Sequence, residues 1–85
     1  MKEPRWSLLK SERLKRVRGV SFEELIRARL VAVKQHPTRT HQQIMLFDYH
    51  GYIWVVPFVE SEDELFLKTL FPSRVSTRRY RKGEL

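Results

Sequence analysis

The residues best suited to chemistry lie near the C-terminus, in a basic cluster that includes one aromatic hydroxyl. Six basic residues and no acid lie between positions 68 and 82, namely Lys68, Arg74, Arg78, Arg79, Arg81 and Lys82, with Tyr80 among them. An arginine guanidinium is a planar fork of donors that binds phosphate through two hydrogen bonds and also stacks on a base. Arg74 and Arg78 are four residues apart, so they share one face if the segment is helical. The cluster predicts a surface for a nucleic acid, RNA before DNA; an ordinary solvated terminal segment is the alternative.

Cleavage of RNA without a metal ion needs three kinds of group. These are a base for the 2′-hydroxyl proton, cations for the pentavalent phosphate and an acid for the leaving oxygen. Arginine and lysine supply the cations, whereas proton transfer would fall to Tyr80, a histidine, or a lysine or acid with a shifted pKa. His36, His41 and His50 are expected in loops or turns, where we interpret them as solvated side chains in preference to a shared metal site.

Other kinds of site are excluded by the residues themselves. The chain has no cysteine, which excludes disulfides, thiolate zinc sites and a cysteine nucleophile. Its three glycines are isolated, so there is no glycine-rich phosphate loop, and no glycine-flanked serine resembles a nucleophile elbow. We therefore expect neither a metal nor a cofactor.

The composition predicts one folded domain over residues 1–85. Hydrophobic residues make up 41% and aromatic residues 12% of the chain, which is too apolar for a disordered basic tail. The longest apolar stretch, 52–59, is interrupted by Pro57 and is far shorter than the ~20 residues of a membrane helix. The charged N-terminal segment does not resemble a signal peptide. We expect a soluble, cytoplasmic protein.

The net charge of +7 is concentrated at the two ends of the chain. Residues 1–20 carry seven Lys and Arg against two acids, residues 21–60 carry four of each, and residues 61–85 carry six against four. If the two ends meet in the fold, they form one surface for a polyanion. Charge that serves only solubility is the alternative.

Two helices are expected in the N-terminal part. The first covers residues 7–18, where Leu14 and Val17 are the clearest apolar pair at helical spacing, and Gly19 suits its C-terminus. The second begins at Phe22, because Ser21 and Glu24 form a capping box, and it ends between 28 and 30.

The rest of the chain favours strands and a final basic helix. We expect a possible short strand over 30–33, strands over 43–49, 52–59 and 64–71, and a C-terminal helix or extended arm over 73–82. The 64–71 strand would carry Lys68. His50–Gly51 is a hairpin-turn signal, and Pro57 indicates an edge or bulge in its strand. This order predicts an α+β fold with two N-terminal helices, a three- to four-stranded, mainly antiparallel sheet and a short C-terminal helix, the helices packing on one face.

Several motifs in chain order resemble those of the BrnT-type toxins. The N-terminal ones are Trp6-Ser7-Leu8-Leu9-Lys10, Leu14 and Arg18-Gly19-Val20-Ser21-Phe22-Glu23-Glu24. The C-terminal one is Pro72-Ser73-Arg74-Val75-Ser76-Thr77-Arg78-Arg79-Tyr80. Three further motifs are similar to those of related small toxins, namely His36-Pro37, Val56-Pro57-Phe58 and Phe66-Leu67-Lys68-Thr69. Together they extend over most of residues 6–80.

The resemblance implies a RelE/ParE-like toxin of a two-gene toxin–antitoxin module. Such toxins are typically ribonucleases that arrest translation, either free or on the ribosome. The implied partner is a cognate antitoxin, often a ribbon-helix-helix protein, in a dimer or a toxin–antitoxin heterotetramer. Lys10 and Arg74 match basic positions of the family pattern, and Thr77, Arg78 and Tyr80 match its C-terminal helix. Val75 departs from the pattern, which has lysine there.

The leading hypothesis is a metal-independent ribonuclease with a groove formed by the first helix and the C-terminal segment. In it Arg74 and Lys68 bind the scissile phosphate and Tyr80 transfers a proton. The RNA backbone is held by four further cations, Lys10, Arg13, Arg78 and Arg79. Two alternatives stay open: a nucleic-acid-binding module without catalysis, and a basic surface that chiefly binds the antitoxin.

Overall fold

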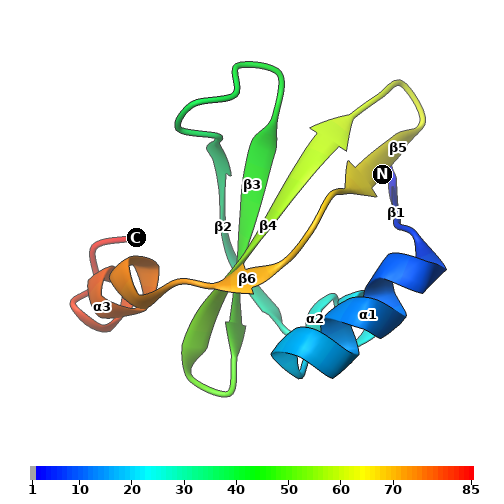
Figure 1. The fold of residues 1–85 in the computed structure, drawn as a ribbon. Helices are drawn as coiled ribbons and strands as arrows, with labels where there is room; N and C mark the ends of the chain where they lie inside the picture. The colour runs from blue at the N-terminus through cyan, green and yellow to red at the C-terminus, as the bar shows by residue number, and fades with distance from the viewer. Residues whose placement is uncertain (1) are drawn as a thin grey trace.

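The computed structural model describes residues 2–85 as an α+β fold with three helices and a mixed sheet (Figure 1). The helices are α1 (Leu8–Arg18), α2 (Phe22–Leu25) and α3 (Arg74–Arg81). The strands are β1 (Glu3–Arg5), β2 (Arg29–Gln35), β3 (Gln43–Tyr49), β4 (Tyr52–Glu60), β5 (Glu64–Leu67) and β6 (Phe71–Pro72).

The sheet is built around an antiparallel meander of β2, β3, β4 and β5. Its strand order is β1-β5-β4-β3-β2, and β6 pairs with β4 beyond the end of β5. β1 runs parallel to β5, with Pro4 opposite Leu65. The meander confirms the expected strands, but the sheet has six strands instead of three or four. β1 and β6 have only three and two residues, too few to show a period-two pattern in the sequence.

The β3–β4 hairpin turns where the sequence predicts. His50 and Gly51 have φ angles of 54° and 81°, the left-handed values that a two-residue type I′ turn requires at both positions. The Gly51 N–H donates to Asp48 Oδ1 at 2.8 Å, which holds the turn. β4 then pairs with β3 along its length, from Tyr52 opposite Tyr49 onward.

The expected strand over 64–71 is wrong in its second half. β5 ends at Leu67, and Leu67 and Leu70 are both buried in the same core, whereas side chains three apart in a regular strand point to opposite faces of the sheet. The chain therefore leaves the sheet at Lys68, although the Lys68 N–H still donates to the Pro57 carbonyl at 2.8 Å. Pro57 has no N–H to donate, so it suits the point on β4 where its neighbour leaves. Lys68 thus lies on a connection and not on a strand.

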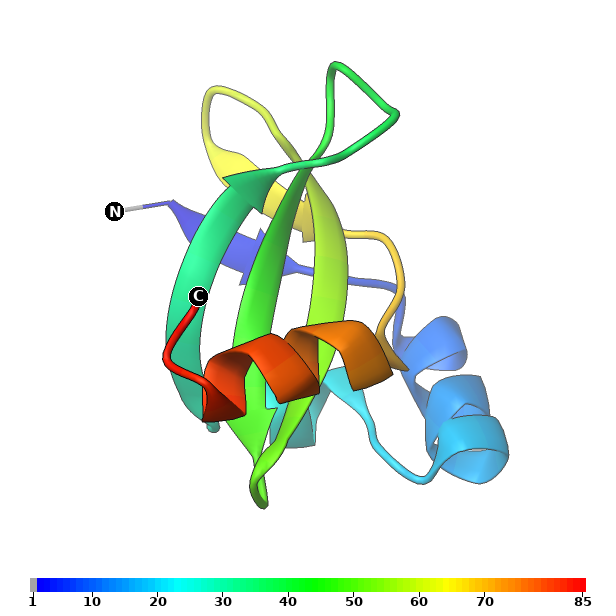
Figure 2. The ribbon, with the colours of Figure 1, turned by 90° about the vertical axis from the view of Figure 1, so that its left-hand side faces the viewer.

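The helices cover both faces of the sheet, which corrects the expectation of one face. The larger core lies on one face and combines Leu14 of α1 and Phe22 and Leu25 of α2 with Met45, Phe47, Trp54, Val56 and Phe58 of the sheet. The smaller core lies on the other face and combines Leu46, Ile53 and Val55 with Tyr80 of α3. Figure 2 shows α3 across the front of the sheet with α1 behind it.

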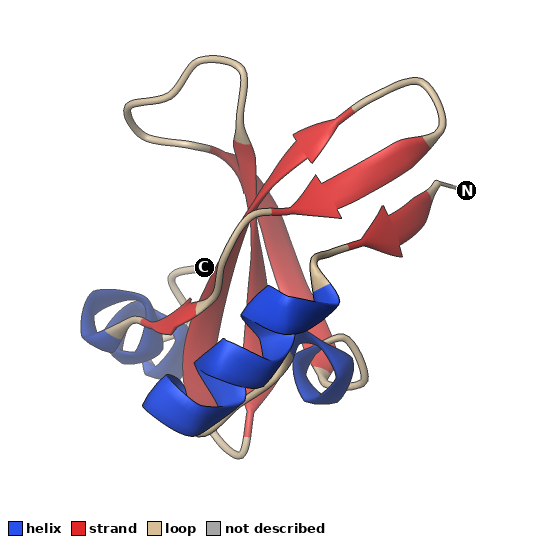
Figure 3. Cartoon of the chain, turned by 45° about the vertical axis from the view of Figure 1, so that its right-hand side comes forward, coloured by secondary structure: helices blue, strands red, loops and turns tan. Residues whose placement is uncertain are grey.

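The first helix has the predicted ends but only one of its two predicted apolar contacts. Ser7 caps its N-terminus by accepting from the Lys10 N–H at 3.2 Å, and Gly19 ends it at φ 82°. Leu14 is buried, whereas Val17 is 70% exposed. α1 packs against the fold through Ser11 and Leu14, its two buried residues. Figure 3 shows this helix in front of the sheet.

The second helix is shorter than expected. The Ser21–Glu24 capping box is present, but α2 ends at Leu25 and the chain enters β2 at Arg29. The apolar run after Leu30 pairs with β3 instead of extending the helix, so the possible strand over 30–33 is a seven-residue strand.

A hydrogen-bond network joins the N-terminal segment, α1 and α2. Ser11 is 1% exposed; its Oγ donates to Glu23 Oε1 and accepts from the Phe22 N–H at 3.0 Å. Trp6 Nε1 donates to Glu23 Oε2 at 3.0 Å. The Ser11 hydrogen bond, ahead of the others, lowers the pKa of Glu23. The neighbouring Lys15 ammonium is the main reason that the pKa of Glu24 is lowered to about 2.

Protonation of these two glutamates should destabilise the fold. Because their pKa values are lowered in the folded chain, their contribution is fully present above the ordinary value of 4.5 and is lost as the pH falls towards about 2. We expect Glu23→Gln to flatten the fall in unfolding free energy between pH 7 and pH 3, measured by urea denaturation, and the exposed Glu62→Gln to leave it unchanged. Ser11→Ala, which leaves the Phe22 N–H without an acceptor, should cost ~1–3 kcal/mol at pH 7. An unaltered pH profile in Glu23→Gln would contradict this account.

Candidate functional site

Cations from three distant parts of the chain meet in a cleft of about 270 Å³. We call it the basic cleft; it is lined by Lys10, His36, Arg39, Gln42, Pro57, Lys68, Thr69 and Phe71. Lys10 comes from the first turn of α1, His36 and Arg39 from the β2–β3 loop, and Lys68 from the β5–β6 connection. No carboxylate lines this cleft, so it suits an anionic ligand.

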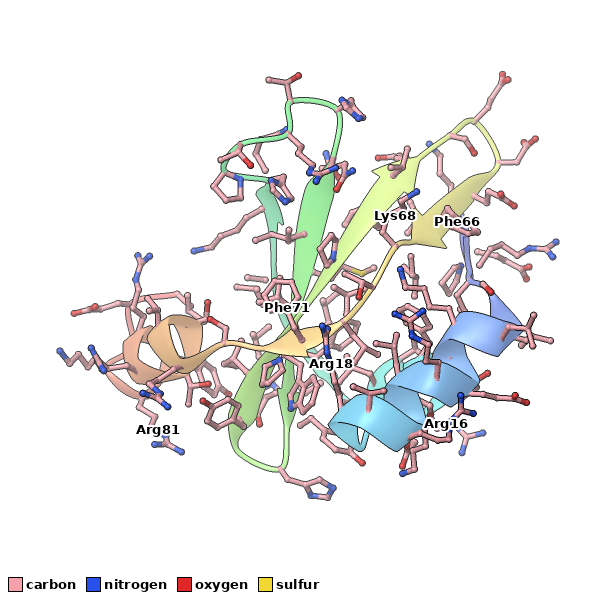
Figure 4. All side chains as sticks on the ribbon, in the orientation of Figure 1. Arg16, Arg18, Phe66, Lys68, Phe71 and Arg81 are labelled. Carbon is pink, nitrogen blue, oxygen red and sulfur yellow. The ribbon has the colours of Figure 1, made fainter. Side chains whose placement is uncertain are left out.

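Lys68 is positioned by its own backbone and by a neighbouring ring. Its N–H is bound to the Pro57 carbonyl, and its Nζ lies 5.5 Å from the centroid of the Phe66 ring. At this distance the face of the ring attracts an ammonium group. Lys68 and Phe71 are both labelled in Figure 4, on the two sides of the connection that leads from β5 into β6.

His36 lines the basic cleft and holds the β2–β3 loop through one ring nitrogen. Its Nδ1 accepts from the backbone N–H groups of Thr38 and Arg39, both at 3.1 Å. A neutral ring with Nδ1 as acceptor carries its proton on Nε2. The ring closes the β2–β3 loop, whose ends are joined by the His36 N–H donating to the Gln42 carbonyl at 3.1 Å.

His36 and Arg39 line the basic cleft but were not among the predicted site residues. Both were expected in a polar loop, and only the pairing of β2 with β3 brings that loop to Lys68. The available local signal was the His36-Pro37-Thr38-Arg39 run, because a histidine just before a turn can accept from the backbone N–H groups that follow it.

The cations of the basic cleft are not neutralised by the protein. Among residues 2–85 the ion pairs are Lys2–Glu60 and Arg5–Glu64, near β1, and Lys15–Glu24, between α1 and α2. None includes Lys10, Arg39 or Lys68, so these charges remain available to a ligand.

A second basic surface lies along α3. This α3 hollow, of about 350 Å³, is lined by Tyr52, Arg74, Thr77, Arg78, Arg81 and Lys82. Arg74 and Arg78 share a face of the helix, as their spacing predicts. Thr77 fixes that face: its Oγ1 accepts from the Ile53 N–H at 2.8 Å and donates to the Ser73 carbonyl at 2.7 Å.

Tyr80 lies on the sheet side of α3 and lines neither surface. Its hydroxyl donates to Asp48 Oδ2 at 2.9 Å. This hydrogen bond is the main cause that raises the pKa of Tyr80 above 10, and burial adds to it. The structure therefore holds Tyr80 apart from Lys68, in a contact that docks α3 on β3.

The first helix and the C-terminal segment do not form the two walls of one groove. Lys10 lines the basic cleft with Lys68, whereas Arg74 and Arg78 line the α3 hollow, because α3 docks on the face of the sheet opposite α1. Arg13 and Arg79 are exposed and line neither. Val75 is 64% exposed and lines neither.

Comparison with known proteins does not assign the chain to a family. Family models, curated proteins and solved structures gave no match to it. In residues 2–85, no group of three or more metal-ligating side chains is placed to hold an ion. No helix in that range has the length and apolarity to cross a membrane.

The variant Tyr80→Phe tests whether the Tyr80 hydroxyl serves to dock α3 on the sheet or to transfer a proton. Loss of the hydroxyl should lower the melting temperature at pH 7, because Asp48 loses its donor. The raised pKa means that Tyr80 contributes stability below pH 10 that is lost as the pH rises through its folded pKa, so the variant should lose less stability at high pH than the wild type. Thermal denaturation at pH 7 and pH 11 checks both points. An unchanged melting temperature with lost RNA cleavage would instead assign Tyr80 to proton transfer.

Proposed function

We propose that this chain is the toxin of a two-gene toxin–antitoxin module and that its basic cleft binds and cleaves RNA without a metal ion. The observation that carries the proposal is the convergence of Lys10 and Lys68 with His36 and Arg39 in a cleft without carboxylates. Three of these residues, Lys10, His36 and Lys68, belong to the motifs that resemble BrnT-type toxins and related small toxins. The α+β order of helices, meander and final helix is compatible with a RelE/ParE-like fold.

The basic cleft supports cleavage chiefly through stabilisation of charge. Attack of the 2′-oxygen on phosphorus forms a 2′,3′-cyclic phosphate and breaks the bond to the 5′-oxygen. Lys10, Arg39 and Lys68 would neutralise the oxygens of the pentavalent phosphate, and His36 Nε2–H would donate to one of them. Donors held in place before the reaction lower its barrier, and each donor commonly raises the rate by a factor of roughly 10²–10³.

Proton transfer is the step of the reaction that the side chains at this site support least. His36 Nδ1 is occupied by two backbone N–H groups, and Tyr80 is bound to Asp48. This favours a second candidate function, a module that binds RNA in the same cleft without cleaving it. In the ribonuclease, solvent water would take the 2′-hydroxyl proton, and the ammonium group of Lys10 or Lys68 would donate a proton to the leaving 5′-oxygen.

The proposal includes a cytoplasmic location and a cognate antitoxin, of the ribbon-helix-helix type, in a toxin–antitoxin heterotetramer. What supports a protein partner is the unneutralised positive charge of both basic surfaces, which an acidic antitoxin segment would cover. Covering the basic cleft would also exclude RNA, so one contact would both bind and inhibit the toxin.

Induced expression in bacteria and cleavage of RNA by the purified chain in EDTA test the ribonuclease. Lys68→Gln should reduce cleavage by about 10²-fold or more, because a fixed cation at the phosphate is lost. His36→Asn keeps an acceptor for the Thr38 and Arg39 N–H groups but removes the Nε2–H donor, so it should fold normally and cleave more slowly. The control is Arg16→Gln, an exposed arginine of α1 away from the cleft (Figure 4), which should match the wild type.

The same experiment separates the two candidate functions. Wild-type protein that binds RNA with a steep salt dependence but neither cleaves it nor arrests growth is the binding module. Equal activity in wild type, Lys68→Gln and His36→Asn would exclude the basic cleft as the site.

A further inference from the structure

The basic cleft and the α3 hollow are joined by a very short piece of chain. Phe71 lines the cleft and Arg74 lines the hollow. The two residues are three positions apart in the sequence, so their Cα atoms lie at most ~11 Å apart even in a fully extended chain. The two basic surfaces are therefore neighbours along β6, although α1 and α3 lie on opposite faces of the sheet (Figure 1).

The joined surface has charge of one sign only. Lys10, Arg39 and Lys68 line the cleft, and Arg74, Arg78, Arg81 and Lys82 line the hollow, with no carboxylate in either. None of these seven takes part in an ion pair within residues 2–85. A row of unpaired cations of this kind follows a phosphate backbone.

A fixed aromatic ring lies between the two sets of cations. Phe71 is 37% exposed, while its neighbour Leu70 is fully buried. Phe71 is held by pairing of β6 with β4, opposite Val55. Aromatic rings on sheets beside a basic groove are the surfaces on which unpaired bases stack. A duplex keeps its bases inside the helix, so only a single strand can use this ring.

We infer that the two surfaces form one track for a single-stranded nucleic acid, with Phe71 stacking on a base between the cleft and the hollow. The inference rests on the proposed RNA binding in the basic cleft and extends it to a strand of about four to eight nucleotides, within the range of comparable sites. Cleavage would then take place at one end of the bound strand, and α3 would hold the other.

Binding of labelled 2′-O-methyl RNA tests the track, because such RNA cannot be cleaved through its 2′-oxygen. Mixed A/U strands of two, six and twelve nucleotides are titrated with the full chain and followed by fluorescence anisotropy. We expect Lys68→Gln to weaken binding of all three, and Arg78→Gln to weaken only the two longer strands. Arg16→Gln is the charge-matched control for both, since its side chain lines neither surface.

Phe71 is tested by two variants. Phe71→Leu retains apolar bulk on β6 but has no ring, so it should fold and bind the six-nucleotide strand about fivefold or more weakly, with the salt dependence unchanged. Phe71→Ala should weaken it at least as much. A six-base-pair duplex should bind equally to wild type and Phe71→Leu.

The outcomes distinguish the track from the proposed function. If Lys68→Gln alone weakens binding, at every length, the track is wrong and the cleft remains the RNA site. If no variant differs from Arg16→Gln, both proposals fail. Equal affinity for poly-glutamate of matched charge, with no effect of Phe71→Leu, would show a general anion surface for an acidic protein and would overturn the track.

Discussion

The structure depends on β4, a strand whose two faces are both buried and whose two edges are both paired. Its even-numbered residues Trp54 and Val56 enter the core under α1 and α2, and its odd-numbered residues Ile53 and Val55 enter the core under α3. β3 pairs with it along one edge, and β5 and β6 share the other. The backbone of Ile53 even binds α3, through Thr77 Oγ1 and the Ser73 N–H. A change that shifted β4 would thus displace every basic surface at once.

The shared edge of β4 is also what places Lys68. A neighbour that paired without interruption would keep Lys68 in the ladder, but the chain leaves at Leu67 and returns at Phe71 so that Leu70 can be buried. Pro57 tolerates this gap because it has no N–H to leave unpaired. Because of this interruption, Lys68 lines the basic cleft instead of occupying a position in the ladder. Burial of one leucine and exposure of one lysine are therefore two results of the same break.

Charge is divided between structure and binding. Glu23 and Glu24 accept hydrogen bonds that join α1 to α2, and Glu60 and Glu64 pair with Lys2 and Arg5 beside β1 and β5. None of these four glutamates lines the basic cleft or the α3 hollow. Within residues 2–85, the cations of the basic cleft and the α3 hollow form no ion pair, so the electrostatic potential of this side is positive.

Local sequence signals determined much of the fold and only part of the site. The Ser21–Glu24 capping box, Gly19, the His50–Gly51 turn and the alternation in β3 and β4 are interactions between near neighbours, so they could be predicted without knowledge of the rest. The end of α2, the break at Lys68 and the face on which α3 docks depend on burial against distant residues, and those predictions were incomplete or wrong. The basic composition of the C-terminal segment was evident from the sequence. Its division into a cleft with Lys10 and His36 and a hollow along α3 was decided by tertiary structure alone, because only packing on the two faces of β4 determines which cations become neighbours.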